Sequence, residues 1–181
     1  MQSSPLPKCQ SCYICEIMIT IFVISALRHD CYSYSKYYYE HLPMLDRITS
    51  ISALHQLNPL LFWTIIRVSS YRHPKYTDTC TLSASAYQSL LCATICNPIR
   101  DFRTVQALVI LCYWPNSGER QSQDPSWQYC GVALNSAMQM GIDQPCHEGV
   151  NAGFGGHSNI HQMSSYSRQM TWLAHFCIST R

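Results

Sequence analysis

Charged side chains are scarce in this sequence. They make up 12% of its 181 residues, and the formal net charge is only +2. A nucleic-acid-binding domain usually has a strongly basic face, so we expect no specific binding to duplex DNA. Apolar runs are short as well. The stretch from Ile17 to Leu27 has eleven residues, whereas a membrane-spanning helix needs about 20, and we therefore expect no membrane partner.

Sequence motifs for catalysis are also missing. The glycines between Gly149 and Gly156 lack the Gly-Lys-Ser/Thr ending of a phosphate-binding loop, and no strand-like segment precedes them. No Gly-x-Ser-x-Gly nucleophile motif accompanies the eight histidines. We interpret histidines such as His55, His73 and His175 as helix-end or surface residues. The sequence thus predicts that the protein is not an enzyme, with no catalytic residues and no cofactor.

Cysteine is abundant, but its distribution does not indicate a disulfide framework. The chain has eleven cysteines, an odd number without regular spacing. Several fall within apolar helical stripes, where cysteine behaves as a small hydrophobic residue: Cys92, Cys96, Cys112 and Cys130. This pattern favours a reducing, intracellular compartment.

Three N-terminal cysteines, Cys9, Cys12 and Cys15, are the sharpest candidate for a metal site. A structural zinc site needs four ligands, usually in two pairs separated by a loop. The next cysteine is Cys31, and the apolar run fills the interval. We therefore favour chance clustering over metal binding, and we predict no metal ligands.

A helix that is buried on most sides is predicted to end before Pro115 and Asn116, which stop it. Its main apolar face recurs at helical spacing, and Leu108 and Leu111 widen that face. The residues of the main face are Phe102, Val105, Val109 and Cys112.

A second central helix is predicted to run from Asp124 to Gly141. We expect Asp124 to be its N-cap and Pro125 its first helical residue, with Gly141 as the C-terminal stop. Its apolar stripe consists of Trp127, Cys130, Leu134, Ala137 and Met138. We expect Leu108 of the first helix and Leu134 of the second to meet in the core.

Further helices are predicted on both sides of this pair. Asn58 and Pro59 begin one that closes at His73. A second spans about Thr77–Cys96 and is stopped by Asn97-Pro98, and the last begins near Met163. No stretch shows sustained strand alternation, so the predicted fold class is all-α, with antiparallel helix pairs joined by short loops.

Several of these stretches resemble the fungal transcription-factor regulatory domain, also called the middle homology region, which lies downstream of a zinc-cluster DNA-binding domain. The resemblance covers residues 36–181 in a consistent order. It is carried by residues 105–115, 124–127 and 131–134, by residues 58–66, and by the Arg-x-x-Thr-Trp-Leu element at 168–173. These are packing motifs, so they identify a family rather than a reaction.

The resemblance implies a regulatory module that tunes a transcription factor in the nucleus. The implied partners are other regions or subunits of that factor and a small-molecule effector. DNA would be contacted only through a zinc-cluster domain, whose six-cysteine pattern is absent here. Since the family's domain continues beyond its Thr-Trp-Leu element, we expect residues 36–181 to be a partial domain. Residues 141–145 replace the family's Gly-Leu-His-Arg-Pro with Gly-Ile-Asp-Gln-Pro, which changes any contact made there.

Residues 1–30 do not resemble the family. We expect a non-homologous segment that is poorly ordered or forms a short helix. The alternative hypothesis is a small Cys-rich secreted or membrane-associated protein, in which Ile17 to Leu27 is the apolar region of a signal peptide and Lys8 its positive flank. No small-x-small cleavage site follows the run, and this favours the first interpretation.

The tryptophans admit two interpretations. They could line an apolar pocket for an effector or fill the core, and the second is favoured; the residues are Trp63, Trp114, Trp127 and Trp172.

The last helix carries apolar residues on more than one face: Met170, Trp172, Leu173, Phe176 and Ile178. Exposed apolar patches promote association, so we expect the isolated chain to be oligomeric or poorly soluble.

Overall fold

The computed structural model describes residues 34–46, 50–71, 77–115, 124–144 and 164–180. Secondary structure in these ranges is helical and includes no strand, which confirms the predicted all-α class. The elements are a π-helical turn η1 (Tyr34–Tyr38) and the helices α2 (Ile51–Leu57), α3 (Pro59–Tyr71), α4 (Thr77–Ile95), α5 (Phe102–Tyr113), α6 (Ser126–Gln139) and α7 (Ser165–Ser179).

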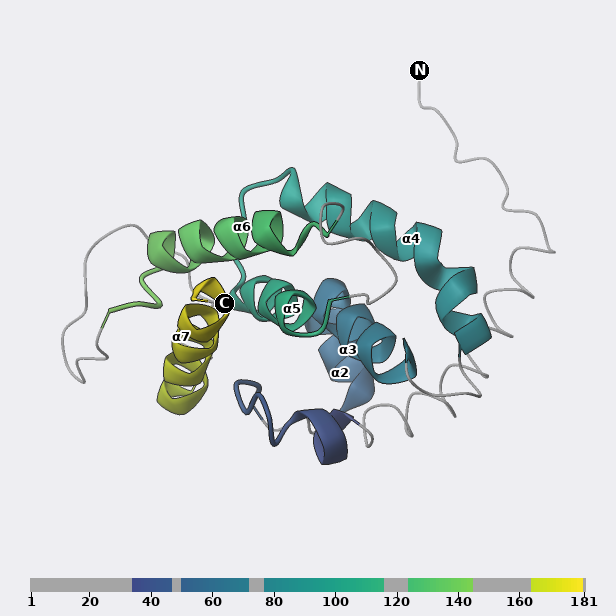
Figure 1. Cartoon of the computed structure of the whole chain (residues 1–181), viewed down its shortest axis with the longest axis horizontal. Coiled ribbons are helices and arrows are strands. Elements are labelled where there is room, and N and C mark those ends of the chain that lie inside the picture. The colour runs from purple at the N-terminus through teal and green to yellow at the C-terminus, as the bar shows by residue number, and fades with distance from the viewer. Residues whose placement is uncertain (1–33, 47–49, 72–76, 116–123, 145–163, 181) are drawn as a thin grey trace, which may run out of the picture.

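Helix α5 lies at the centre of the fold. It packs against α3, α6 and α7, while α4 packs against α3 (Figure 1). Nearly every side chain of α5 is buried, as predicted for a helix with apolar residues on most sides: Phe102, Thr104, Val105, Gln106, Ala107, Leu108, Val109, Ile110 and Cys112. Helices α3, α6 and α7 are thus arranged around one buried, mainly apolar helix, and α2 and α4 pack on α3.

The ends of α5 follow from local capping. The carboxylate of Asp101 accepts a hydrogen bond from the Arg103 backbone N–H at 3.0 Å, which satisfies one of the free donors at the helix N-terminus. At the other end the Trp114 N–H donates to the Ile110 carbonyl, and Pro115 follows. The predicted helix and its predicted stop are both confirmed.

Asn58 begins α3 and also joins it to α5. Its Oδ1 accepts a hydrogen bond from the Leu61 N–H at 2.7 Å, the predicted N-cap contact. Its Nδ2 donates to Asp101 at 2.8 Å and to the hydroxyl of Thr104 at 2.9 Å. One buried amide therefore places the N-terminal ends of α3 and α5 side by side, with its donors satisfied.

Helix α6 begins one residue later than predicted. Pro125 is its N-cap and Ser126 its first helical residue, although the Asp124 carboxylate still accepts from the Ser126 N–H at 3.0 Å. The predicted stop is confirmed, because Gly141 has a φ of +70°. The Ile142 N–H donates to the Ala137 carbonyl and the Gly141 N–H to that of Met138, which is a Schellman termination.

The predicted apolar stripe of α6 is wrong in three of its five members. Trp127 is 73% exposed and Met138 53%, and Leu134 is half-buried rather than a core residue. The buried residues are Cys130, Ala133, Ser136 and Ala137. Small side chains let two helix backbones approach closely, so α6 turns its small face toward α5 and its bulky face outward.

The remaining helices agree with the sequence in position, with one omission. Helix α4 ends at Ile95, before Asn97-Pro98. Helix α7 begins after Ser164, whose Oγ accepts from the Ser167 N–H at 3.1 Å, within two residues of the predicted start. Helix α2 was not predicted, and its N-cap is Ser50. It is only seven residues long, too short for a clear periodic signal.

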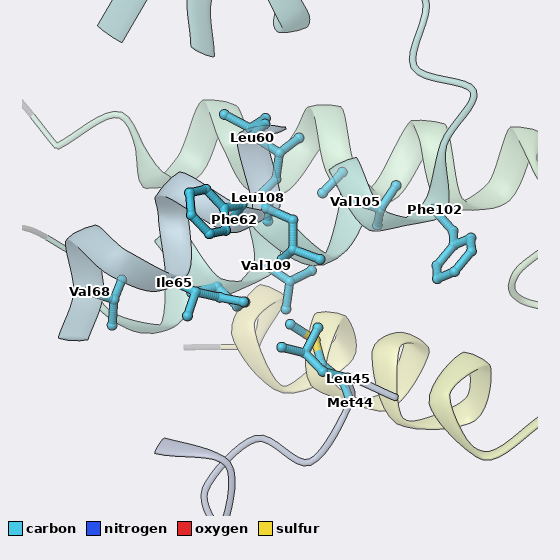
Figure 2. Close-up of a cluster of buried hydrophobic side chains, with 14 of the residues drawn as sticks. Met44, Leu45, Leu60, Phe62, Ile65, Val68, Phe102, Val105, Leu108 and Val109 are labelled. Atoms are coloured by element: carbon cyan, nitrogen blue, oxygen red, sulfur yellow. The ribbon is translucent and has the colours of Figure 1, made fainter. Parts of the chain in front are cut away.

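The hydrophobic core surrounds the middle of α5. Figure 2 shows side chains of α3 and α5 packed together, with Met44 and Leu45 directed toward Val109. The segment that carries Met44 and Leu45 precedes α2, so the N-terminal approach to the helices is part of the core. Leu108 is completely buried, as predicted.

Some sequence predictions lie outside the described residues. They concern the structure of residues 1–30, the cysteines at positions 9, 12 and 15, the closing His73, and the glycines at 149–156. The prediction of a second apolar face on the last helix, by contrast, falls on described residues. Leu173 and Phe176 of α7 are 53% and 62% exposed, as that prediction requires, while the oligomeric state stays a prediction.

Candidate functional site

A cleft of about 510 Å³ lies between α4 and the junction of α5 with α6. Its volume falls within the range of about 300–1,000 Å³ that is usual for small-molecule sites. Apolar side chains from four helices line it: Val68, Leu91, Ile95, Leu111 and Val132. The cleft exists because α4 packs on α3 and α6 packs on α5, which leaves a space between α4 and α6.

A few polar groups reach the same cleft: Arg67, Gln88, Asp124, Gln128 and Tyr129. Asp124 is held in place, because its Oδ1 accepts from both the backbone N–H and the hydroxyl of Ser126. The guanidinium of Arg67 lies 5.1 Å from the ring centroid of Tyr87, a cation–π contact. Burial raises the pKa of Tyr87 to about 12, although its hydrogen bond with Thr64 acts against this, so the phenol stays neutral.

The tryptophans do not form a common site. Trp114 lines the cleft and packs edge-on against Tyr34 and Tyr38, with ring centroids 6.3 and 5.1 Å away. Trp63 contacts Phe62 instead. Trp172 lies over His175 on α7, and Trp127 projects into solvent. The favoured core interpretation is wrong for Trp127, and the other three are half-buried at the margin of the core.

A buried glutamine joins three parts of the chain. The side-chain amide of Gln106 on α5 donates to the Met44 carbonyl at 2.8 Å and lies 3.1 Å from the hydroxyls of Ser167 and Thr171 on α7. The role of Gln106 was not predicted from the sequence. The available signal was a polar side chain inside an otherwise apolar helix, and such a group must find partners when it is buried.

The Arg-x-x-Thr-Trp-Leu element has a structural explanation. Arg168 donates from its guanidinium to the carbonyls of Gly141, Ile142 and Gln144, the turn that ends α6. Thr171 contacts Gln106, and Trp172 stacks on His175. Because Arg168 lies near the end of α6 and His175 near Cys130 at its start, α6 and α7 are antiparallel, as predicted for helix pairs.

His175 is buried, not a surface or helix-end histidine as the sequence suggested. It is 2% exposed, and its Nε2 lies 3.9 Å from the Sγ of Cys130. Burial lowers its pKa from the ordinary value of 6.5, because a charged imidazolium loses hydration inside the protein. His55, by contrast, is exposed at the end of α2, as expected.

This burial predicts a pH-dependent stability. The unfolded chain takes up a proton at His175 near pH 6.5, whereas the folded chain does so only at lower pH. The stability that the buried, neutral His175 contributes to the folded chain is therefore complete above pH 6.5. It is lost as the pH falls toward the folded-state pKa. Thermal unfolding between pH 8 and 5 should show a shallower pH dependence for His175→Gln than for the unmodified chain. His55→Gln is the matched control, and an equal effect of the two substitutions would contradict the prediction.

The described cysteines divide into buried and exposed. Cys112 and Cys130 are buried as predicted. Burial raises the pKa of Cys112 to about 12 and also raises that of Cys130, so both remain neutral thiols. Cys92 and Cys96 are exposed, so their assignment to the apolar stripe of their helix was wrong. That stripe consists of Tyr87 and Leu91, with Ala84 and Ile95 half-buried.

Among the described residues, no three His, Cys, Asp or Glu side chains are grouped so that they could hold a metal ion. None of the helices described is both long and apolar enough to cross a bilayer.

The helical fold and its packing motifs define the class of protein. Residues 31–178 match the family model of the fungal specific transcription factor domain, and this chain belongs to that family. It is therefore an all-α regulatory domain of the fungal transcription-factor type.

Individual relatives support the same assignment. The chain is 32% identical over 111 residues to the transcriptional regulatory protein SEF1 of Candida albicans. This aligned region covers 60% of this chain and 12% of that protein. The chain is 26% identical over 121 residues to the regulatory protein LEU3 of Saccharomyces cerevisiae, covering 59% and 14%. The putative transcription factor SEF1 of the same yeast is 30% identical over 104 residues, covering 56% and 9%.

The chain thus spans a small part of the length of the curated relatives that it matches. No solved structure matches it. None of the comparisons supports the alternative of a Cys-rich secreted or membrane-associated protein.

Proposed function

We propose that this domain regulates transcription by restraining a fungal zinc-cluster-type transcription factor, and that a small effector bound in the cleft relieves the restraint. Support for a role in transcription regulation comes from the family match over residues 31–178 and from relatives whose names describe transcriptional regulators. Residues 36–181 form the regulatory unit in this proposal, and residues 1–30 lie outside it.

The cleft is the single observation that carries the effector proposal. Its lining combines apolar side chains with the polar groups of Asp124, Gln128 and Tyr129. This combination suits a small, mainly apolar molecule that is oriented by a few hydrogen bonds. Because the cleft lies between α4 and α6, an occupant would contact both helices and favour one arrangement of them over others.

The proposal includes a location and a set of partners. The domain acts in the nucleus and contacts other regions or subunits of the transcription factor. DNA is bound only through a zinc-cluster domain that these 181 residues do not contain. The domain is not an enzyme, since its sequence motifs are those of helix packing.

A reporter assay tests the proposal. The chain is placed between an unrelated DNA-binding domain and an activation domain in yeast, and reporter output is compared with that of a fusion without it. We expect the chain to lower the output severalfold. Gln128→Trp places an indole at the cleft and mimics an occupant, so it should raise the output again.

Asn135→Trp is the matched control for the cleft. Asn135 is exposed two turns further along the same face of α6, and it is not one of the residues that line the cleft. The Asn135→Trp substitution should leave the reporter output low. Equal output with and without the chain, at equal protein levels, would exclude a restraining role, and equal effects of the two tryptophans would exclude the cleft.

A further inference from the structure

Two exposed cysteines lie one helical turn apart at the C-terminal end of α4, Cys92 within the helix and Cys96 directly after its last residue. Cysteine is among the residues most often buried in proteins, yet Cys92 and Cys96 are both exposed and both line the cleft. Neither contributes to the apolar core, so packing does not account for them. Their exposure leaves both sulfur atoms accessible from solvent.

The helical register continues through both residues. The Cys96 N–H donates to the Cys92 carbonyl at 3.0 Å, one residue beyond the last residue of α4. The Asn97 side chain then donates to the Ala93 carbonyl at 2.7 Å and closes this last turn. Side chains four residues apart on a helix lie on the same face, with Cβ atoms about 5–6 Å apart. The two thiols can therefore bind one ion from two sides.

The donor set selects the kind of ion. Zinc in a structural site requires four ligands in a tetrahedron, and the described residues offer no third His, Cys, Asp or Glu beside this pair. Soft thiolate ligands select Cu⁺ among the common biological metals, and Cu⁺ is stable with two sulfur ligands in a line.

We propose that Cys92 and Cys96 form a two-coordinate thiolate site for Cu⁺ at the edge of the cleft. On binding, each thiol releases one proton to the solvent and two Cu–S bonds form, with no transfer of electrons. The resulting unit carries one negative charge, and the cleft that both cysteines line also contains one cationic residue, Arg67, and one carboxylate, Asp124. The site is independent of the proposed effector, because it needs only the last turn of α4.

Anaerobic titration of the full chain with Cu⁺ tests the proposal. The reduced protein competes with a chromophoric Cu⁺ chelator, and the number of ions retained per chain is measured. Cys92→Ser, Cys96→Ser and the double variant should each retain one ion fewer than the unmodified chain, because either thiol alone is an incomplete site. The other cysteines are common to all these chains and cancel in the comparison.

Cys177→Ser is the matched control, since Cys177 is also exposed but lies on α7. It should retain as many ions as the unmodified chain. Far-UV circular dichroism establishes that each variant is folded; all three substitutions are at exposed positions. Full retention by the double variant would overturn the proposal, as would an equal loss in Cys177→Ser, which would mean that surface thiols bind Cu⁺ indiscriminately. Neither result depends on the reporter assay.

Discussion

Leu108→Ala is expected to lower the free energy of unfolding by about 2–5 kcal/mol. Leu108 is completely buried in the middle of α5, the helix on which α3, α6 and α7 pack. The substitution removes the transfer free energy of the lost carbons and leaves a cavity that three packed helices cannot readily fill. Chemical denaturation followed by circular dichroism measures the change.

Two further leucines calibrate this result. Leu134→Ala on α6 should cost less, because Leu134 is only half-buried. Leu173→Ala on α7 should change stability by no more than about 0.5 kcal/mol, since Leu173 is mostly exposed. A loss at Leu134 equal to that at Leu108 would contradict the arrangement of α6 described above and restore the original sequence prediction.

Gln106→Glu should be strongly destabilising although it is an isosteric change. The amide of Gln106 faces a carbonyl and two hydroxyl oxygens in the core. A carboxylate has the same shape but no hydrogen to donate. An uncompensated buried charge costs about 3–5 kcal/mol, so the variant should be strongly destabilised at pH 8.

The loss should diminish at lower pH. Burial raises the pKa of a carboxyl group above its unfolded value of about 4.3. The folded variant therefore binds a proton that the unfolded chain has released, and its stability increases as the pH falls from 8 toward 5. Gln128→Glu, at an exposed position of α6, is the control and should have little effect at either pH. A loss that did not depend on pH would show that the new carboxyl group remains hydrated.

The positions of most helices were predictable because short sequence signals mark their ends. Asn58-Pro59 begins α3, Asn97-Pro98 follows α4 and Gly141 ends α6. These residues act through backbone geometry and local hydrogen bonds, which depend little on the rest of the molecule. The family resemblance was recognisable for a related reason: its motifs are residues that set helix ends and helix contacts.

The buried face of each helix was less predictable. In α6 the bulky Trp127 and Met138 suggested the core, but small residues such as Ala133 face α5. Hydrophobicity alone ranks the larger residues first, whereas close helix packing depends on the space that the neighbouring helix leaves. His175 shows the same limit, because its burial comes from the approach of α6, a helix that begins 49 positions earlier in the chain.

The candidate sites depend on long-range arrangement and were not predictable in detail. The cleft is formed by four helices, and only Trp114 among the four tryptophans borders it. Cys92 and Cys96 had been assigned to the core by their apolar surroundings in the sequence. Their position relative to the cleft follows from the packing of α4 on α3, which no local pattern specifies.

The hydrogen bonds of Gln106 have a consequence for synthesis of the protein. Met44 precedes Gln106 by 62 residues, whereas Ser167 and Thr171 follow it by 61 and 65. At roughly 5–20 residues per second, the ribosome needs about 3–13 s to add the 65 residues that separate Gln106 from Thr171. During this interval the amide has only its N-terminal partner, and the face of α5 that later meets α7 is uncovered. The nascent chain therefore passes through a stage at which a chaperone that recognises apolar helices would have its best opportunity to bind.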